Sequence, residues 1–539
     1  MNPLLLGGEG LAYAAATAAV GWLGWRRARS VADYLASGRE THPTLTALAY
    51  GGTFVTVSAV VGFGGMAALH GLGLLWLSAL NVLLGVFVAF AVYGPAARRL
   101  GAALDAHTLP ELLGRRFRSR FVQGLGGGLV ALLVPLYAAA MLVGAARFLE
   151  AELNVGYRQA LLGFGLLAIA YVWWGGARGV LHSEAFQGAL VLAGMLALAA
   201  VIWVQVGGAA GLAALRDAPV PAELVARGHR GWTAMPAAGS PLWWQLVSSL
   251  SLGVGLGALA QPALAVRLHR AHDRRELTRA LVPGALFVVV LTAGAFLVGA
   301  LSNVWFLARS GRSALPAAAD PLTGAPDADR VIPRLVHDAL PEWAGYLLLL
   351  VLLAAALSAL ASQLHAAGSA VGRDLLQEAL ARGRPRRWTG SAARAAALAG
   401  AAAALGIAWR LPASSVATTT ALSFGLCAAA FLPALTAALF WPRATGGGAG
   451  AGMAAGAGAW ALWALLVHRP ESAAPGPGRW AAGTVWAHVD PVAVALPLSA
   501  LITVAVSLAT RPGGSGAAPA PAGRGGGEKS TAGAGSGFA

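Results

Sequence analysis

The sequence predicts an all-α polytopic membrane protein that crosses a bilayer about 13 times. Hydrophobic residues make up 57% of the chain and charged residues only 11%, whereas a soluble domain is about 25% charged. The mean hydropathy is +0.67, and the apolar residues gather in runs long enough to cross a bilayer. Lipid is therefore the expected solvent for most of the chain, which excludes an ordinary soluble globule.

The apolar runs give the expected helices in chain order. The hydrocarbon core of a bilayer takes roughly 20 residues of helix, so each run of about that length is one predicted span. The first run has no basic segment before it and no convincing cleavage site after it, so we expect a retained span and not a signal peptide. The runs lie near residues 3–25, 43–69, 72–97, 120–148, 157–176, 184–206, 241–266, 278–307, 343–371, 391–409, 413–441, 446–467 and 488–509.

The basic residues test this count. With the N-terminus outside, about 26 of the 38 Lys and Arg residues fall in cytoplasmic connections and the tail, and about 12 fall outside. Cytoplasmic connections of membrane proteins carry such an excess, and a miscounted span would mix the two sets. The sequence thus predicts a multi-pass protein of the plasma (inner) membrane with a cytoplasmic C-terminus.

The net charge of +16 raises the question of nucleic-acid binding. The arginines stand in short clusters between apolar runs and form no continuous stripe. We therefore expect membrane lipid and a small solute as partners, and no nucleic acid. The single cysteine, Cys427, excludes an intramolecular disulfide and a Cys-rich metal site.

The predicted spans divide the chain into four segments. Residues 1–42 hold the first span and a basic cytoplasmic connection, residues 43–441 a transport core of ten helices, and residues 442–511 two accessory spans. Residues 512–539 consist mostly of Gly, Ala, Pro and Ser. Such a composition buries too little apolar surface to fold, which predicts a disordered cytoplasmic tail.

Glycine clusters indicate that the second and seventh spans are discontinuous helices. The second span has glycine pairs at 51–52 and 64–65, and the seventh has glycines across 253–257 ahead of Gln261-Pro262. Transporters break helices near the midplane so that backbone groups are free to hold an ion. The two spans stand five helices apart, which predicts an inverted 5+5 repeat of spans 2–6 and 7–11. The alternative is that the glycines only allow close helix packing.

A polar stripe runs along the ninth predicted span. Its members Ser358, Ser362, His365 and Ser369 lie at positions i, i+4, i+7 and i+11, which is one face of a helix. Such a stripe has to face protein or water and not lipid. Serine hydroxyls suit a weakly held monovalent cation, and the alternative is hydrogen bonding between helices alone.

Two segments carry charge near the predicted membrane boundary. Glu184 opens the sixth span, where it is either a residue favoured by the helix dipole or a cation relay at the cytoplasmic exit. Thr108-Leu-Pro-Glu111 matches a capping box with an early proline, which predicts a short cytoplasmic helix. The glycine-rich stretch 124–128 has no P-loop lysine and no preceding strand. We therefore expect neither an enzyme nor a cofactor besides the coupling ion.

Six segments of the chain occur together in a recognisable order. They are Asp33–Arg39, the loop with Thr108, Glu111 and Arg116-Phe117, the segment from Gly175-Gly176 through Glu184 to Gln187, Gln261-Pro262 with Arg267, the ninth-span serines with Arg373-Asp374, and Phe440–Thr445 before Gly450–Met453. With these segments the chain resembles the sodium:solute symporter family from about residue 33 to about residue 456. The resemblance implies the broken-helix fold of the amino-acid symporters.

The resemblance also implies a sodium site between the second and ninth spans. Its ligands would be the carbonyls of Gly52, Val55 and Ala355 and the hydroxyl of Ser358. The family's second hydroxyl falls on Ala359, which has none, and the family's usual aspartate in the sixth span is Glu184. Sodium is the favoured coupling ion, with Ser362 and Glu184 as further candidates for cation binding, and a proton relay through Glu184 is the alternative.

The function we expect is secondary active symport, the import of a small organic solute by cation-coupled alternating access. A monocarboxylate or an amino acid is the favoured cargo, and Phe54 indicates an apolar pocket wall. A solute-sensing module that acts with a separate kinase, and a membrane-embedded enzyme, are the weaker alternatives. The candidate substrate-binding residues are Thr53, Phe54, Ser58, Ser248 and Phe424.

Overall fold

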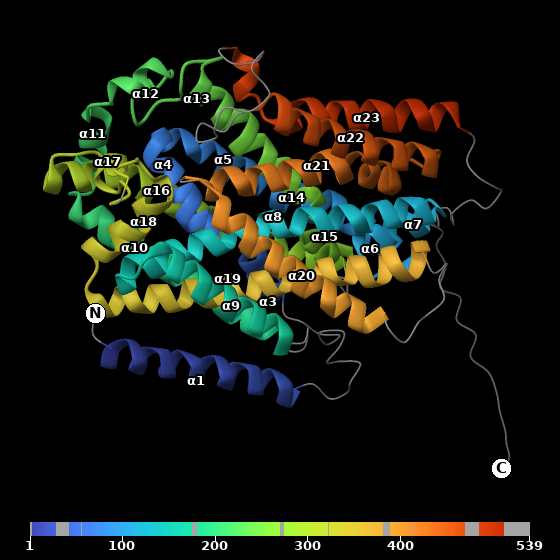
Figure 1. Cartoon of the computed structure of the whole chain (residues 1–539), viewed down its shortest axis with the longest axis horizontal. Coiled ribbons are helices and arrows are strands. Elements are labelled where there is room, and N and C mark those ends of the chain that lie inside the picture. The colour runs from blue at the N-terminus through green and yellow to red at the C-terminus, as the bar shows by residue number, and fades with distance from the viewer. Residues whose placement is uncertain are drawn as a thin grey trace, which may run out of the picture.

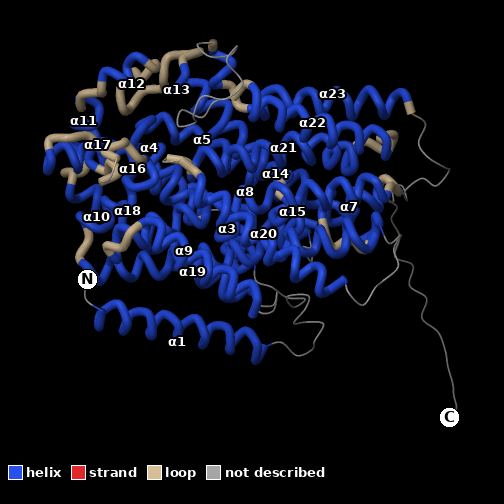
Figure 2. Tube along the Cα trace, in the orientation of Figure 1, coloured by secondary structure: helices blue, strands red, loops and turns tan. Residues whose placement is uncertain are grey.

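The structure is a computed structural model. It describes residues 3–27, 43–54, 56–174, 180–269, 274–321, 323–380, 389–412, 414–468 and 484–510. Every regular element within these residues is a helix, as Figures 1 and 2 show. The predicted all-α class is confirmed, and the predicted tail 512–539 lies outside the described residues.

The helices follow the thirteen predicted runs in order. Apart from those that form the second and seventh spans, described below, they are α1 (Pro3–Arg27), η2 (Gly71–Leu74), α5 (Leu75–Leu80), η3 (Asn81–Tyr93), α6 (Gly94–Leu104), α7 (Leu109–Arg116), α8 (Arg120–Leu153), α9 (Tyr157–Trp174), α10 (Val180–Gln205), α11 (Ala209–Asp217), α12 (Ala222–Ala226), α16 (Arg274–Ser310), α17 (Ala314–Ala317), η5 (Ala328–Arg330), α18 (Val331–Ala339), α19 (Glu342–Ser369), η6 (Ala370–Leu380), α20 (Thr389–Arg410), α21 (Val416–Phe440), α22 (Gly446–Leu466), η8 (Val485–His488) and α23 (Pro491–Ala509).

Ten segments of the described chain are long and apolar enough to cross a membrane. Nine of them coincide with the fourth predicted run and with the sixth to the thirteenth. The tenth, Ala59–Leu104, is a continuous helical stretch that joins the outer part of the second run to the third. The first and fifth runs form the helices α1 and α9, which are not among the ten.

The helices run side by side along the long axis, and the connections gather at the two ends (Figure 1). The helices α11, α12, α17 and α18, all from connections predicted to be outside, lie at the left end with the N-terminus. The helix α7, from a connection predicted to be cytoplasmic, lies at the right end, where α23 also finishes. This separation agrees with the predicted number of crossings, while the absolute orientation stays a prediction.

The second span is broken as predicted. Its first half, α3 (Pro43–Phe54), ends before Thr56, which is not helical, and Val55 lies outside the described residues. The helix resumes at Val57 and continues as the π-helical turn η1 (Ala59–Phe63) and then α4 (Gly64–His70). Backbone groups at the break therefore lack the regular hydrogen bonds of a continuous helix.

The seventh span is also discontinuous, but not at its glycines. It begins as α13 (Pro241–Trp244), the π-helical η4 (Gln245–Gly253) and α14 (Val254–Ala260), and these run on without interruption. The break is at Gln261, whose backbone is extended, and the helix resumes as α15 (Pro262–His269). Proline has no N–H and clashes with the preceding helical turn, so it ends α14 there.

The glycines of the seventh span serve close packing, which is the alternative that their sequence left open. A Cβ atom at Gly257 would lie 2.3 Å from the carbonyl oxygen of Phe424 in α21, and one at Gly255 would lie 2.9 Å from Leu80. Gly257 excludes a side chain because the backbone of α21 approaches α14 directly, whereas Gly255 faces the side chain of Leu80 in α5. The predicted discontinuity of the seventh span is therefore confirmed, but the prediction that it lies at glycines 253–257 is wrong.

The core of the molecule lies around α8 and α21, the most buried of the ten membrane-crossing segments. The accessory helices α22 and α23 pack against each other and against α21, and α1 lies against α10 and α19. The predicted N-cap of α7 is confirmed, because the Thr108 hydroxyl accepts a hydrogen bond of 3.1 Å from the Glu111 amide. The Glu111 carboxylate accepts from the amide of His107 at 2.8 Å, one residue before the N-cap.

Candidate functional site

The break in the second span presents backbone oxygens and hydroxyls to the core. Gly52 is half-buried in the last turn of α3, where helix carbonyls have no intrahelical partner and the helix dipole is negative. Just beyond, the hydroxyls of Thr56 and Ser58 share a hydrogen bond of 2.7 Å. Such a helix C-terminus is suited to a bound cation.

The helix α19 supplies the other half of the predicted cation site. It is in contact with α3, and its Ser358 is 8% exposed while Ala355 and Ser362 are half-buried. Ala359, which has no hydroxyl to offer, is buried beside Ser358. The two elements that should hold the ion are therefore adjacent, and the ligand set itself remains a prediction.

Two predicted cation-binding residues cannot be placed further. Val55 lies outside the described residues, and Glu184 lies in the second turn of α10 with a side chain outside the described set. The helix α10 packs against α3, so the sixth span does adjoin the broken span. The role of Glu184 stays a prediction.

Two predicted substrate-binding residues, Phe54 and Phe424, are brought together by the fold. Their ring centroids are 6.4 Å apart, with α3 supplying one ring and α21 the other. Tyr137 of α8 packs edge-on against Phe424 at 5.3 Å, and its hydroxyl faces Thr56 and Ser58. This aromatic group, Phe54, Phe424 and Tyr137, forms an apolar wall beside the break, with one phenol and two aliphatic hydroxyls.

Tyr137 was not predicted from the sequence. Its only local signal is a hydroxyl-bearing aromatic in an otherwise apolar span, since buried tyrosines usually find a polar partner. Its neighbours at the break lie about 80 positions earlier in the chain, and a single sequence does not reveal such a pairing.

Of the other three predicted substrate-binding residues, Ser58 lies beside this aromatic group, whereas Ser248 has other partners. The Ser248 hydroxyl donates to the Trp244 carbonyl at 2.6 Å and accepts from the Asp490 amide at 3.0 Å. It thereby holds the start of α23 against η4, a structural task that its sequence did not indicate. Thr53 lies in α3, and its side chain is outside the described set.

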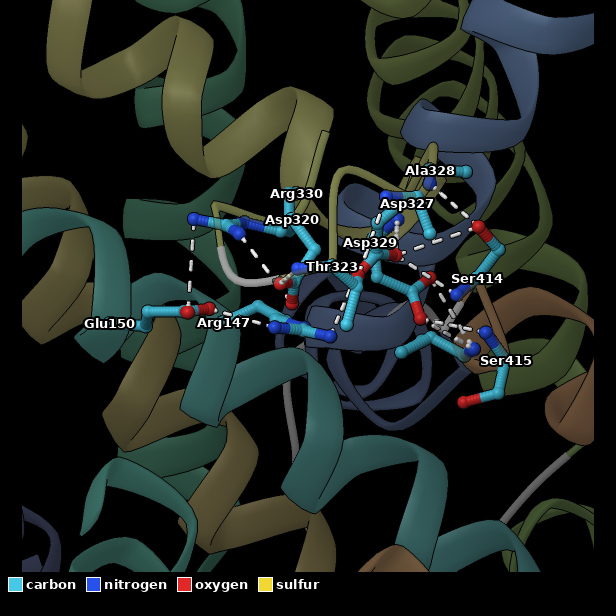
Figure 3. A network of polar contacts seen from close by, with 12 residues as sticks. Arg147, Glu150, Asp320, Thr323, Asp327, Ala328, Asp329, Arg330, Ser414 and Ser415 are labelled. Carbon is cyan, nitrogen blue, oxygen red and sulfur yellow. Dashed lines mark hydrogen bonds and ion pairs between the residues drawn. The ribbon is translucent and has the colours of Figure 1, made fainter. Parts of the chain in front are cut away.

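A network of buried charges lies beside α17 and α18, at the end of the molecule that carries the predicted outer connections. Figure 3 shows the network from close by. We call it the outer network. It joins the end of α8, the connection between α16 and α19, and the start of α21. Its members are Arg147, Glu150, Asp320, Asp327, Asp329, Arg330, Ser414 and Ser415.

Arg147 is the central cation of the outer network. Its Nη2 lies 2.6 Å from Asp327 Oδ2, and its Nη1 donates to Glu150 at 2.9 Å. The guanidinium also lies 4.0 Å from the centre of the Tyr157 ring. Asp327 is fully buried and accepts from the amide of Ser414 at 2.9 Å, so this carboxylate is paired on both sides.

Asp329 caps α21 from another part of the chain. Its carboxylate accepts hydrogen bonds from the amides of Ser415 at 2.8 Å and Val416 at 3.1 Å, at the positive end of that helix. One residue earlier, Ala328 rests directly on α4, where a Cβ atom on Gly65 would lie 1.9 Å from its carbonyl oxygen. The connection is thus seated on the broken span and pinned to α8 and α21.

Replacing Asp329 with asparagine should remove a pH dependence of stability. Burial, and then the charge of Asp327, raise the pKa of Asp329 from 3.8 to about 7. A carboxyl with a higher pKa when folded takes up a proton on folding, so stability should rise as the pH falls from about 8 to about 5. The asparagine side chain keeps an acceptor for Ser415, so Asp329→Asn should raise the unfolding temperature at pH 8 and flatten this slope.

Thermal unfolding in detergent across this pH range would check the expectation. Asp217→Asn is the control, because Asp217 is an exposed carboxylate at the end of α11 and its loss should leave the slope in place. A slope that Asp329→Asn leaves unchanged would contradict the assignment.

A second polar group, the inner network, lies at the opposite end of α8. The Asp374 carboxylate accepts from Thr108 at 2.9 Å and from Gln123 at 2.9 Å, and Glu111 pairs with Arg373 at 2.8 Å. These contacts tie α7 and the start of α8 to η6. Both ends of the central helix α8 are therefore fixed by charge.

Comparison with known proteins agrees with this architecture. The sodium:solute symporter family matches residues 34–456. The chain is 25% identical to the sodium/proline symporter of Escherichia coli over 445 residues, which cover 80% of this chain and 82% of that protein. It is 25% identical to the sodium/pantothenate symporter of Haemophilus influenzae over 436 residues, which cover 80% and 84%.

A solved structure shares the fold. A sodium-coupled sialic acid symporter in a substrate-bound outward-open state superposes with a TM-score of 0.69 at 17% identity, covering 94% of this chain and 98% of that one. At this identity the likeness shows the fold alone, and it confirms the predicted inverted-repeat, broken-helix architecture. Since the family match spans most of the sequence, the chain belongs to the sodium:solute symporter family.

Proposed function

We propose that this protein is a secondary active symporter that imports a small organic solute by sodium-coupled alternating access. The observation that carries the proposal is the break of the second span beside α19. It leaves the C-terminal carbonyls of α3 next to a helix with a buried hydroxyl, Ser358. Unpaired backbone is costly in hydrocarbon, so such a break persists where it binds something.

Sodium is the coupling ion we propose, held by Gly52, Val55, Ala355 and Ser358. Oxygen ligands without a fixed negative charge suit a monovalent cation that has to bind and leave in each cycle. The relatives in Escherichia coli and Haemophilus influenzae are both sodium symporters, which supports this choice over a proton. Ser362 and Glu184 are further candidates for cation binding.

The cargo we propose is an amino acid or a small monocarboxylate. The rings of Phe54 and Phe424 give an apolar wall, and the hydroxyls of Tyr137 and Ser58 are hydrogen-bonding groups beside it. A compact solute with one apolar face and one carboxylate matches this pairing. Proline and pantothenate, the cargoes in the names of the two relatives, are both carboxylates.

Uptake into proteoliposomes tests the proposal. The purified full-length protein would be given labelled proline, pantothenate, pyruvate or acetate under an inward sodium gradient, an inward proton gradient, or neither. We expect at least one solute to accumulate with the sodium gradient only. A control variant is Ser369→Ala. Ser369 lies at the exposed end of the polar stripe on α19, away from the proposed site, so this variant should transport normally.

The other outcomes separate the alternatives. Accumulation that follows the proton gradient and not sodium would overturn sodium coupling in favour of a proton-coupled carrier. Binding of a solute without accumulation under any gradient would favour a solute-sensing module. Fusion of a reporter enzyme to each terminus would test the proposed orientation in the plasma membrane, with the N-terminus outside and the C-terminus in the cytoplasm.

A further inference from the structure

The break in the seventh span is closed by a single buried side chain. Gln261 is 1% exposed and stands between α14 and α15. Its Oε1 accepts a hydrogen bond of 2.9 Å from the amide of Leu264, and its backbone carbonyl accepts from Ala265 at 2.9 Å. Gln261 is therefore the N-cap of α15, which needs such a partner because its first amides have none.

The same side chain crosses to the ninth span. Gln261 Nε2 donates to Gln363 Oε1 at 2.9 Å, and Gln363 is also 1% exposed. We call this hydrogen bond the amide bridge. It links the start of α15 to α19, one residue beyond Ser362. The helix α19 carries the predicted cation-binding residues Ala355, Ser358 and Ser362, which we call the cation face.

The position of the amide bridge matters because α15 is the inner half of a broken helix. α15 contacts α3, the inner half of the other broken helix, as well as α6 and α19. For the site at the break to open towards the end of the molecule that carries α7, the inner halves have to separate from α19. That movement breaks the amide bridge.

The surroundings decide when the amide bridge can break. A buried amide that loses its partner in an apolar environment costs more than the hydrogen bond itself contributes, whereas water replaces the lost partner at little cost. The amide bridge therefore keeps α15 against α19 until water enters between them. The hydrogen bond therefore breaks only when water hydrates the space between α15 and α19, which is the exit of the site.

We propose that Gln261 and Gln363 are positioning residues of the transport cycle, whose amide bridge holds the inner half of the seventh span closed against the ninth span beside the cation face. The bridge is intact when the inner side is shut and separates when solute leaves on the side of the C-terminus. This proposal rests on alternating access as the proposed function, and the cation and cargo can be of any identity.

A reporter cysteine tests the proposal. Cys427 is the only cysteine of the chain, so Cys427→Ala gives a cysteine-free background. Ala265→Cys then places a thiol at a buried position of α15. A membrane-impermeant maleimide, applied separately to each side of vesicles that contain the full-length protein, measures how often α15 becomes accessible.

Two substitutions at Gln363 should act differently. Gln363→Leu removes the acceptor but leaves the cap of α15 intact, and should raise labelling from the C-terminal side at least about fivefold, because it leaves the buried Gln261 amide without this partner in the closed state. Gln363→Glu keeps an acceptor for Gln261, because desolvation holds a carboxyl at this buried position in its neutral form, and should label no faster than the parent. Damage to the fold would raise labelling in both variants and from both sides.

The matched control is Gln123→Leu. Gln123 is also a buried glutamine that donates from Nε2, but to Asp374 within the inner network, so its loss should not change labelling of the cysteine in α15. Equal labelling rates in the parent and in Gln363→Leu would overturn the proposal.

Sodium-driven uptake by the parent protein is measured in parallel. Transport without a labelling change refutes the amide bridge alone, and a labelling change without transport refutes the proposed function alone.

Discussion

Replacing Arg147 with methionine is expected to destabilise the protein by about 3–5 kcal/mol, the usual cost of leaving one partner of a buried ion pair uncompensated. Asp327 is fully buried, and Arg147 is its cationic partner at 2.6 Å. Methionine fills a similar volume but offers no charge. The connection between α16 and α19 should therefore detach from α8, lowering the unfolding temperature and exposing residues 311–330 to added protease.

The outer network supplies its own controls. Arg330→Met should have a small effect, because Arg330 lies 3.7 Å from Glu150 and 3.8 Å from Asp320 and loosely paired charges within reach of solvent contribute roughly 0–1 kcal/mol. Adding Asp327→Asn to Arg147→Met should recover part of the lost stability, because the buried charge of Asp327 is then removed together with its cationic partner. Equal losses for Arg147→Met and Arg330→Met would refute the central place of Arg147.

The same pair illustrates what a single sequence conceals. Arg147 lies inside an apolar run, and charged residues within spans are rare and usually paired. Its partner Asp327 lies 180 positions later in a connection with several acidic residues, and nothing local distinguishes Asp327 from its neighbours. The presence of a partner could be predicted, but its identity required the fold.

The position of one helix break could be predicted from the sequence, and the position of the other could not. The second span breaks near its glycines, where a weak local helix preference and the need for free carbonyls act at the same place. In the seventh span Gly257 is required by the close backbone of Phe424, a tertiary contact, and the break follows instead from Gln261-Pro262. Glycine permits both uses, and proline does not mark a break by itself either, because Pro135, Pro283 and Pro433 lie inside continuous helices.

The candidate cargo residues divide in the same way. Phe54 and Phe424 were predicted together and pack together. Ser248 was predicted beside them, yet its hydroxyl is engaged by Trp244 and Asp490. Hydroxyls in membrane helices often bond to the preceding turn of their own backbone, and the sequence pattern does not separate this use from ligand binding.

Replacing Ser358 with alanine is expected to remove about half or more of the stabilisation that sodium gives the protein. A ligand that binds only the folded chain stabilises it by RT ln(1 + [L]/Kd), about 2.7 kcal/mol at one hundred times Kd. Ser358 is the buried hydroxyl of α19 in the proposed site, and loss of one ligand oxygen should raise Kd about tenfold or more. The measurement is thermal unfolding in a titration with sodium, with choline as the control cation. In Ser358→Ala the rise in unfolding temperature should be smaller and should need a higher sodium concentration.

The matched control is again Ser369→Ala, whose hydroxyl lies on the same stripe but at its exposed end. It should retain the full sodium response, while Ser358→Ala retains the unfolding temperature of the parent in choline, since a buried serine replaced by alanine leaves no unpaired charge. If both variants respond to sodium like the parent, the ion is not held by Ser358. If the parent itself responds to pH and not to sodium, the carbonyls at the break of the second span do not serve a sodium site, and a titratable group such as Glu184 has to carry the coupling.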